Sequence, residues 1–126
     1  MYQGLIIVAI ISLFVVSAIH SVLGERLLFG PMFKLRGNPV LENTLARFIL
    51  RFIWHMISAM WVVLAVILYA IGFQSDQVIP IALFAIGSSF LASGLIVLVK
   101  SKGKHIGWPF FSVIGACCLG AGVLNS

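Results

Sequence analysis

The chain has 126 residues, of which 62% are hydrophobic and only 9% charged, and its formal net charge is +5. Soluble domains carry about 25% charged residues, and a soluble protein of this length lacks the polar surface to cover so much apolar side-chain area. Much of the surface must therefore face lipid. The few cations form no stripe interleaved with aromatic residues, so the positive charge does not indicate a nucleic-acid partner.

Four apolar runs divide the sequence, each of about the 20 residues that cross a hydrocarbon core as a helix. None contains a lysine, arginine, aspartate or glutamate; they are Gly4–Leu23, Phe52–Phe73, Val78–Val99 and Ile106–Leu124. We expect one domain, residues 1–126, with helices at about 4–23, 46–73, 78–99 and 106–124. Because short connections force antiparallel neighbours, the predicted fold class is an all-α membrane protein, an antiparallel up-down four-helix transmembrane bundle.

The first apolar run has to be distinguished from a secretory signal. Its N-terminal flank, Met1–Gln3, has no positive side chain, and positive charge follows the run at Arg26. A secretory signal has the reverse order of charge and apolar residues. We therefore expect this run to be a retained membrane helix.

The lysines and arginines all fall near two connections. They lie between the first and second spans and between the third and fourth, as Arg26, Lys34, Arg36, Arg47, Arg51, Lys100, Lys102 and Lys104. The opposite side of the predicted membrane has none. The positive-inside rule then predicts a multi-pass protein of the inner (plasma) membrane, with both charged loops cytoplasmic and both termini outside.

The connection from Gly24 to Thr44 is the only long one. Gly30–Pro31 is a turn signal within it. Asn38 can cap a helix that has Pro39 in its first position. The second helix would then run from Pro39 to Gly72, which is longer than the bilayer alone requires.

Polar side chains gather near the charged ends of the first two spans. If the first helix continues by one turn, the face that His20 flanks carries Ser17, Ser21 and Glu25. On the second helix, a similar spacing forms a stripe of Arg47, Arg51, His55 and, less squarely, Ser58. We expect the two stripes to face each other inside the bundle, because ionisable groups at membrane depth are usually paired and inward-facing.

Two of the chemistries that fit these residues involve a metal. Neutral imidazoles with a carboxylate suit zinc, iron or copper, and the candidate metal ligands are His20, Glu25, His55 and His105. His20 and His55 also stand at similar depth, where facing helices can ligate a haem axially. A haem or a transition metal is therefore the cofactor that the sequence allows.

The third chemistry is anion binding. Arg47, Arg51 and His55, together with the lysines, can hold a phosphate or an anionic lipid headgroup. Trp54 adjoins His55 and completes the candidate cofactor-binding set of His20, His55, Arg51, Arg47 and Trp54.

Each of these sites has a simpler alternative. Histidines and arginines near helix ends also serve as interfacial or snorkelling anchors, and Trp54 also fits an interfacial aromatic belt. No HExxH or Glu-x-x-His motif occurs. The sequence also shows no Ser/His/Asp arrangement in a plausible pocket.

We therefore favour a small membrane binding or accessory protein without catalysis of its own. Its cytoplasmic-side His/Arg/Glu cluster would bind anionic lipid or a larger membrane partner. The first alternative is a haem- or metal-binding membrane redox protein that uses His20 and His55. The second is a small transporter, as a homodimer, in which Ser88, Ser89 and Ser93 line a path.

Overall fold

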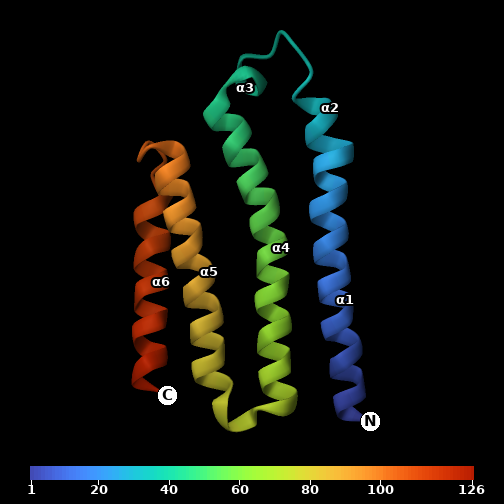
Figure 1. Cartoon of the computed structure of the whole chain (residues 1–126), viewed down its shortest axis with the longest axis vertical. Coiled ribbons are helices and arrows are strands. Elements are labelled where there is room, and N and C mark those ends of the chain that lie inside the picture. The colour runs from blue at the N-terminus through green and yellow to red at the C-terminus, as the bar shows by residue number, and fades with distance from the viewer.

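The computed structural model describes all 126 residues, and every regular element in it is helical. Four long helices dominate the structure (Figure 1): α1, Tyr2–Leu23; α4, Thr44–Phe73; α5, Val78–Ser101; and α6, Gly107–Leu124. Short elements join them: the π-helix η1, Gly24–Phe29; α2, Gly30–Met32; α3, Pro39–Glu42; and the 3₁₀ turn η2, Ser75–Gln77. Four helical segments are long and apolar enough to cross a membrane, which confirms the predicted number of such helices.

The four long helices that we expected to form an up-down bundle lie in an open row. Each packs on its neighbour in the chain, α1 on α4, α4 on α5 and α5 on α6, and α1 makes no comparable contact with α5 or α6 (Figure 1). A closed bundle would surround a common core, whereas only 16 of the 126 residues are buried here. The large apolar side chains that remain exposed give the row a surface suited to lipid.

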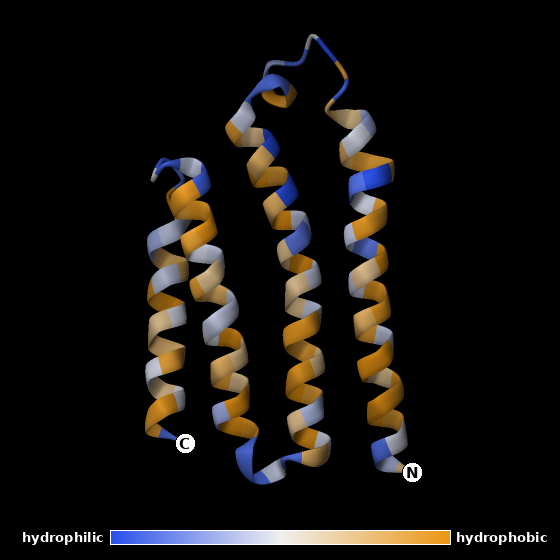
Figure 2. Cartoon of the chain, in the orientation of Figure 1, coloured by the Kyte–Doolittle hydropathy of each residue, from blue (hydrophilic) through white to orange (hydrophobic).

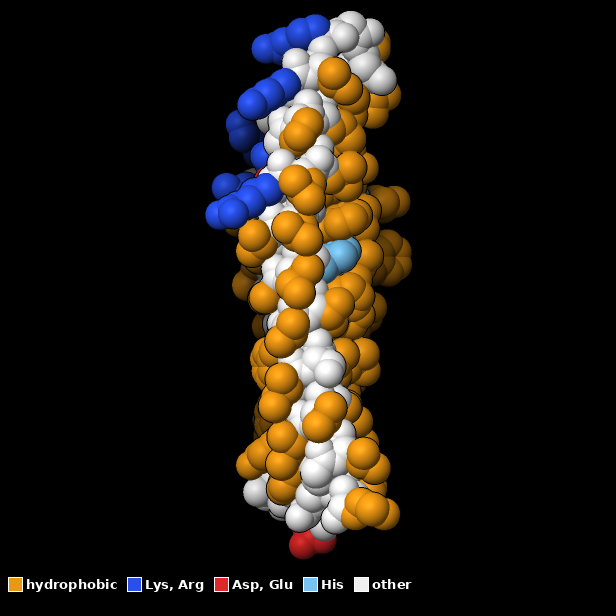
Figure 3. Space-filling view, turned by 90° about the vertical axis from the view of Figure 1, so that its right-hand side faces the viewer, with side chains coloured by type: hydrophobic (Ala, Val, Ile, Leu, Met, Phe, Trp, Pro, Cys, Tyr) orange, Lys and Arg blue, Asp and Glu red, His pale blue; other side chains and the backbone are white.

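Charge is distributed unevenly along the length of the row. The chain reverses direction at each connection, so that both termini lie at one end of the molecule (Figure 1). Hydrophilic positions on α1 and α4 concentrate toward the other end (Figure 2). The view onto the α1 side shows the lysine and arginine side chains at that same end and an acidic side chain at the opposite one (Figure 3).

The first helix does not turn at Gly30–Pro31, contrary to our prediction. Gly30 keeps helical dihedral angles (φ −56°, ψ −55°), and its N–H bonds to the carbonyl of Glu25, five residues back. Pro31 lies near the C-terminal end of this continuous helical segment and has no backbone N–H to donate. The wider π-turn therefore lets the helix continue through Met32, with Glu25 inside it.

Two asparagines cap successive helices after the loop. Asn38 caps α3 and Pro39 follows it, as predicted. Asn43, however, is extended (φ −75°, ψ 121°) and accepts the N–H of Ala46 at 3.0 Å, which starts a new helix. The second long helix therefore begins at Thr44, and the predicted continuous helix from Pro39 is wrong.

Helices α5 and α6 approach each other through glycines. A Cβ atom added to Gly115 would lie 2.6 Å from the backbone nitrogen of Leu91. A Cβ atom added to Gly87 would lie 2.9 Å from the backbone nitrogen of Leu119. Close backbone contact of this kind is how apolar helices associate when lipid supplies no hydrophobic driving force.

Gly115→Ala should therefore destabilise the α5–α6 hairpin. The new methyl group meets backbone atoms that cannot move aside, so we expect a loss of about 1–3 kcal/mol in the free energy of unfolding, measured by denaturant titration in mixed micelles. Gly120→Ala in the same helix is the matched control, because nothing lies within 4 Å of its added Cβ. Equal stabilities of the two variants would contradict the proposed packing.

Candidate functional site

The two polar stripes predicted from the sequence face each other across the α1–α4 contact. Hydrogen bonds and one ion pair join them, which confirms their expected juxtaposition, although they meet between neighbouring helices and not inside a bundle. We call this set the α1–α4 network; it comprises Ser17, His20, Ser21, Glu25, Arg51, Trp54, His55 and Ser58.

Glu25 is the centre of the charged half of the network. Its Oε1 atom lies 3.0 Å from Arg51 Nε and 3.0 Å from His55 Nε2. The side chains of Arg51 and Glu25 are 46% and 35% exposed, so water or lipid headgroups can still reach the ion pair. The π-helix carries Glu25 toward α4, and π-turns within helices are frequent at functional sites.

The contacts of His55 define its tautomer. A carboxylate only accepts hydrogen bonds, so Nε2 of His55 donates to Glu25. In the neutral imidazole Nδ1 then carries a lone pair, and it lies 3.1 Å from the Ser21 hydroxyl oxygen. While the ring is neutral, Ser21 therefore donates to His55, and His55 donates to Glu25.

His20 occupies the deeper, more aromatic half of the network. Its ring stacks on that of Trp54, with centroids 4.1 Å apart and planes inclined by 6°, and meets the ring of Trp61 edge-on at 5.0 Å. Its Nδ1 atom lies 2.9 Å from the hydroxyl of Ser58, which is buried. Three side chains of α4 thus surround the imidazole of His20.

The backbones of the two helices are tied together at the same level. The hydroxyl of Ser17 donates to the carbonyl oxygen of Ser58 at 2.9 Å. The indole N–H of Trp54 donates to the carbonyl oxygen of His20, also at 2.9 Å. The indole fits only because position 24 is glycine: a Cβ there would lie 2.1 Å from Nε1 of Trp54. Gly24 therefore sets the distance between the helices.

Aromatic rings also support the arginines. The guanidinium groups of Arg47 and Arg51 lie 5.2 and 5.0 Å from the ring centroid of Phe33, which is buried. Arg47 also donates through Nε to the carbonyl oxygen of Leu41. Arg47 is therefore held outside the Glu25 ion pair, by cation–π contact and by the backbone.

The network as arranged does not fit a haem or a transition metal. Both ring nitrogens of His55 are engaged, so ligation would require it to leave Ser21 or Glu25. His105 lies beyond α5, where its Nδ1 accepts the N–H of Gly107 at 3.0 Å. Nowhere do three or more histidine, cysteine or acidic side chains gather closely enough to hold a metal ion.

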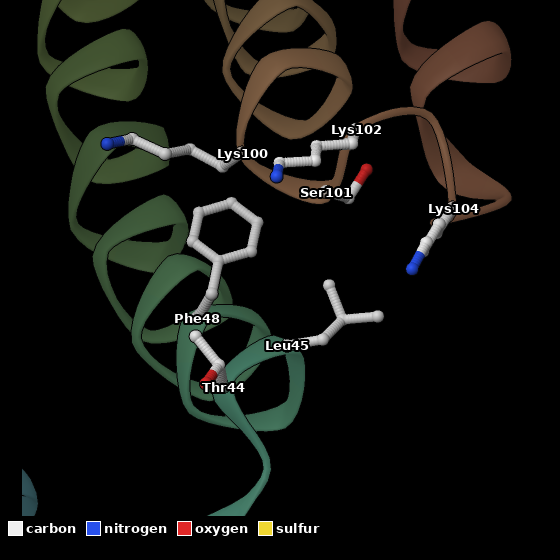
Figure 4. Close-up of a pocket in the computed structure, with 7 residues that line it drawn as sticks. All are labelled: Thr44, Leu45, Phe48, Lys100, Ser101, Lys102 and Lys104. Carbon is white, nitrogen blue, oxygen red and sulfur yellow. The ribbon is translucent and has the colours of Figure 1, made fainter.

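A second feature is a cavity of about 280 Å³ between the start of α4 and the turn after α5. Three cations, two hydroxyl-bearing residues and two apolar side chains border it (Figure 4); the seven residues are Lys100, Lys102, Lys104, Thr44, Ser101, Leu45 and Phe48. We call it the lysine pocket. No acidic side chain lines it.

The turn after α5 explains how three lysines come to border one cavity. Lys102 ends the helix in the left-handed conformation (φ 51°), and Gly103 follows with φ 76°. The N–H of Gly103 bonds to the carbonyl of Leu98, which closes the turn. Ser101 is buried there, and its hydroxyl accepts the N–H of His105 at 3.3 Å.

The sequence identified much of the network but little of the pocket. His20, Glu25, Arg51, Trp54 and His55 were all candidates, and they do meet, whereas the polar contacts of His105 are with Ser101 and Gly107 instead. The pocket was missed because Thr44, Leu45 and Phe48 carry no charge and are distant from the lysines in the chain. The only signal in the sequence that could have linked these residues to the lysines is that both groups lie at the same, charged end of the predicted helices.

No protein-family model, curated protein or solved structure matches the chain. The function must therefore be inferred from the α1–α4 network and the lysine pocket themselves.

Gly24→Ala should open the contact between α1 and α4. The methyl group displaces the indole of Trp54, so we expect hydrogen exchange of the indole N–H, followed by NMR, to become faster in the variant. Gly4→Ala, near the start of α1, has nothing within 4 Å of its added Cβ and should leave that exchange rate unchanged. A protected indole in Gly24→Ala would show that Trp54 does not pack as described.

Proposed function

We propose that the protein is a multi-pass inner-membrane protein that binds anionic lipid headgroups in the lysine pocket. In this proposal four antiparallel helices span the bilayer, the charged loops are cytoplasmic and both termini are outside. The uneven placement of the cations supports this orientation through the positive-inside rule. The observation that carries the function is that three lysines and no acidic residue border this cavity.

The lining of the lysine pocket suits a lipid better than a free anion. Lysine ammonium groups attract phosphate as point charges, and the hydroxyls of Thr44 and Ser101 border the same cavity. Leu45 and Phe48 add apolar surface on the α4 side. A headgroup phosphate with the start of its acyl chains has this combination of charge and apolar area.

The position of the lysine pocket along α4 also fits a headgroup. About 20 helical residues cross the hydrocarbon core, so a span that starts at Phe73 reaches the other edge of the core near Ile53. Phe48 then stands about 8 Å beyond that edge. Lipid phosphates lie at about this level, in the interfacial region outside the core.

The open row leaves room for such a lipid. In Figure 1 the α5–α6 turn stops short of the α2–α3 loop, so that α4 extends beyond α5 at the cation-rich end. Lys100 and Lys102 are exposed there. A lipid can therefore approach the lysine pocket laterally.

Removing the lysines should abolish a preference for anionic lipid. We expect K100Q/K102Q/K104Q to lose up to about 100-fold in the retention of phosphatidylglycerol relative to phosphatidylcholine, since each cation contributes about 1 kcal/mol near a charged surface. Native mass spectrometry of protein released from nanodiscs measures this retention.

The matched control is R26Q/K34Q/R36Q. It removes the same charge from the same end of the molecule, but none of its residues borders the lysine pocket. It should keep the preference for phosphatidylglycerol. An equal loss in both triple variants would mean that only net charge matters, and displacement of the lipid by inorganic phosphate would indicate a site for a free anion.

A further inference from the structure

We propose that Ser21 is a nucleophile activated by His55, and that it accepts the acyl group of a carboxylic ester. The Ser21 hydroxyl oxygen lies 3.1 Å from His55 Nδ1, and His55 Nε2 lies 3.0 Å from Glu25 Oε1. A nucleophile bonded to a base, which is in turn oriented by a third group, is the arrangement that activates serine hydroxyls. The tautomer derived above gives each member its required role, because Ser21 donates to His55.

Other serines of the long helices use their hydroxyls differently. Ser12, Ser88 and Ser112 donate to the backbone carbonyl four residues before them, as helical serines commonly do. Ser58 does meet an imidazole, that of His20, but Ser58 is buried and no carboxylate contacts that ring. Ser21 is only partly buried, and its hydroxyl is linked through the His55 ring to the carboxylate of Glu25.

Glu25 and Arg51 are positioning residues in this proposal. Glu25 holds the imidazole in the tautomer that leaves Nδ1 free to accept a proton, and its charge stabilises the imidazolium that forms. Arg51 pairs with the same carboxylate oxygen at 3.0 Å and so helps to hold Glu25 in place.

The reaction is an acyl transfer in two steps. Ser21 Oγ attacks the ester carbonyl carbon while its proton passes to His55 Nδ1, and collapse of the tetrahedral state breaks the bond to the alcohol oxygen. The departing alcohol takes the proton from His55 and leaves an acyl ester on Ser21. Water then attacks that ester with His55 again as the base, which releases the carboxylic acid and restores the serine.

The depth of the network identifies the class of ester as an acyl lipid. The edge of the hydrocarbon core falls near Ile53 by the residue count along α4, so His55 lies about 3 Å inside that edge. The ester carbonyls of glycerolipids lie at this boundary between acyl chains and headgroups. The substrate class therefore depends on the membrane orientation proposed above, whereas the activation of Ser21 does not.

A fluorophosphonate with a short alkyl chain tests the activation directly. An activated serine displaces fluoride from phosphorus, so Ser21 of the purified wild-type protein should acquire a phosphonate ester, located by peptide mass spectrometry. Because the probe has no anionic headgroup, its reaction does not require the lysine pocket. No adduct on Ser21, or equal labelling of Ser12 on the same helix, would overturn the proposal.

Variants then separate activation from simple exposure. His55→Gln should slow labelling by about 100-fold or more, and Glu25→Gln should slow it to a degree that Glu25→Asp partly restores. Ser12→Ala should label at the wild-type rate. An unchanged labelling rate in His55→Gln would refute the role of His55 as a base. If a variant does not fold, the position of the adduct in the wild-type protein still decides whether Ser21 is activated.

Discussion

The hydrogen bonds that Glu25 accepts from α4 are the interaction on which the rest of the site depends. Helix α1 stands at the edge of the row and packs chiefly on α4. One carboxylate oxygen of Glu25 joins it to two side chains of α4, Arg51 and His55. These contacts fix the rotation of α1, and with it the positions of Ser17, His20 and Ser21.

In the open row α1 packs chiefly on α4, so its position depends on the contacts between these two helices. Between helices that face lipid, association depends on close packing and on interhelical hydrogen bonds. Each such hydrogen bond contributes about 0.6 kcal/mol on average. The hairpin of α5 and α6 uses close packing at glycines such as Gly115. The pair of α1 and α4 combines one close approach, at Gly24, with a cluster of hydrogen bonds. The chemistry of the molecule is therefore concentrated on the first pair.

Hydropathy and helical spacing predicted the parts of the structure that depend on local sequence. The four long helices follow from apolar runs of sufficient length, and the alignment of Ser21 with Glu25 follows from their separation of four residues. The continuation of the helix through Gly30–Pro31 did not follow, because it depends on a π-turn that the local turn signal does not disclose.

Arrangement in space was less predictable. Short connections require antiparallel neighbours, but they leave open whether the two hairpins close into a bundle or extend into a row. The direction of each bond in the α1–α4 network was also beyond the sequence. Spacing placed His55 and Glu25 on facing stripes, but it could not assign one ring nitrogen to Glu25 and the other to Ser21.

The two proposed activities lie at different depths along α4. In the proposed membrane orientation, the lysine pocket is level with Thr44 and Phe48, where headgroups carry their phosphates, whereas His55 is closer to the acyl chains. A lipid held by its phosphate in a membrane places its ester carbonyls a few ångströms deeper. The lysine pocket and the α1–α4 network are thus suited to different parts of a lipid, and because they lie on opposite sides of α4 they would act on different lipid molecules.

The protonation of the His55 ring tests the central claim most directly. Nitrogen-15 NMR of the labelled protein in lipid, at a pH where the imidazole is neutral, distinguishes the two tautomers. A proton on Nε2 and a bare Nδ1 are expected, because Glu25 can only accept. A proton on Nδ1 with Nε2 bare would contradict the account, since His55 could then neither donate to Glu25 nor take the proton of Ser21.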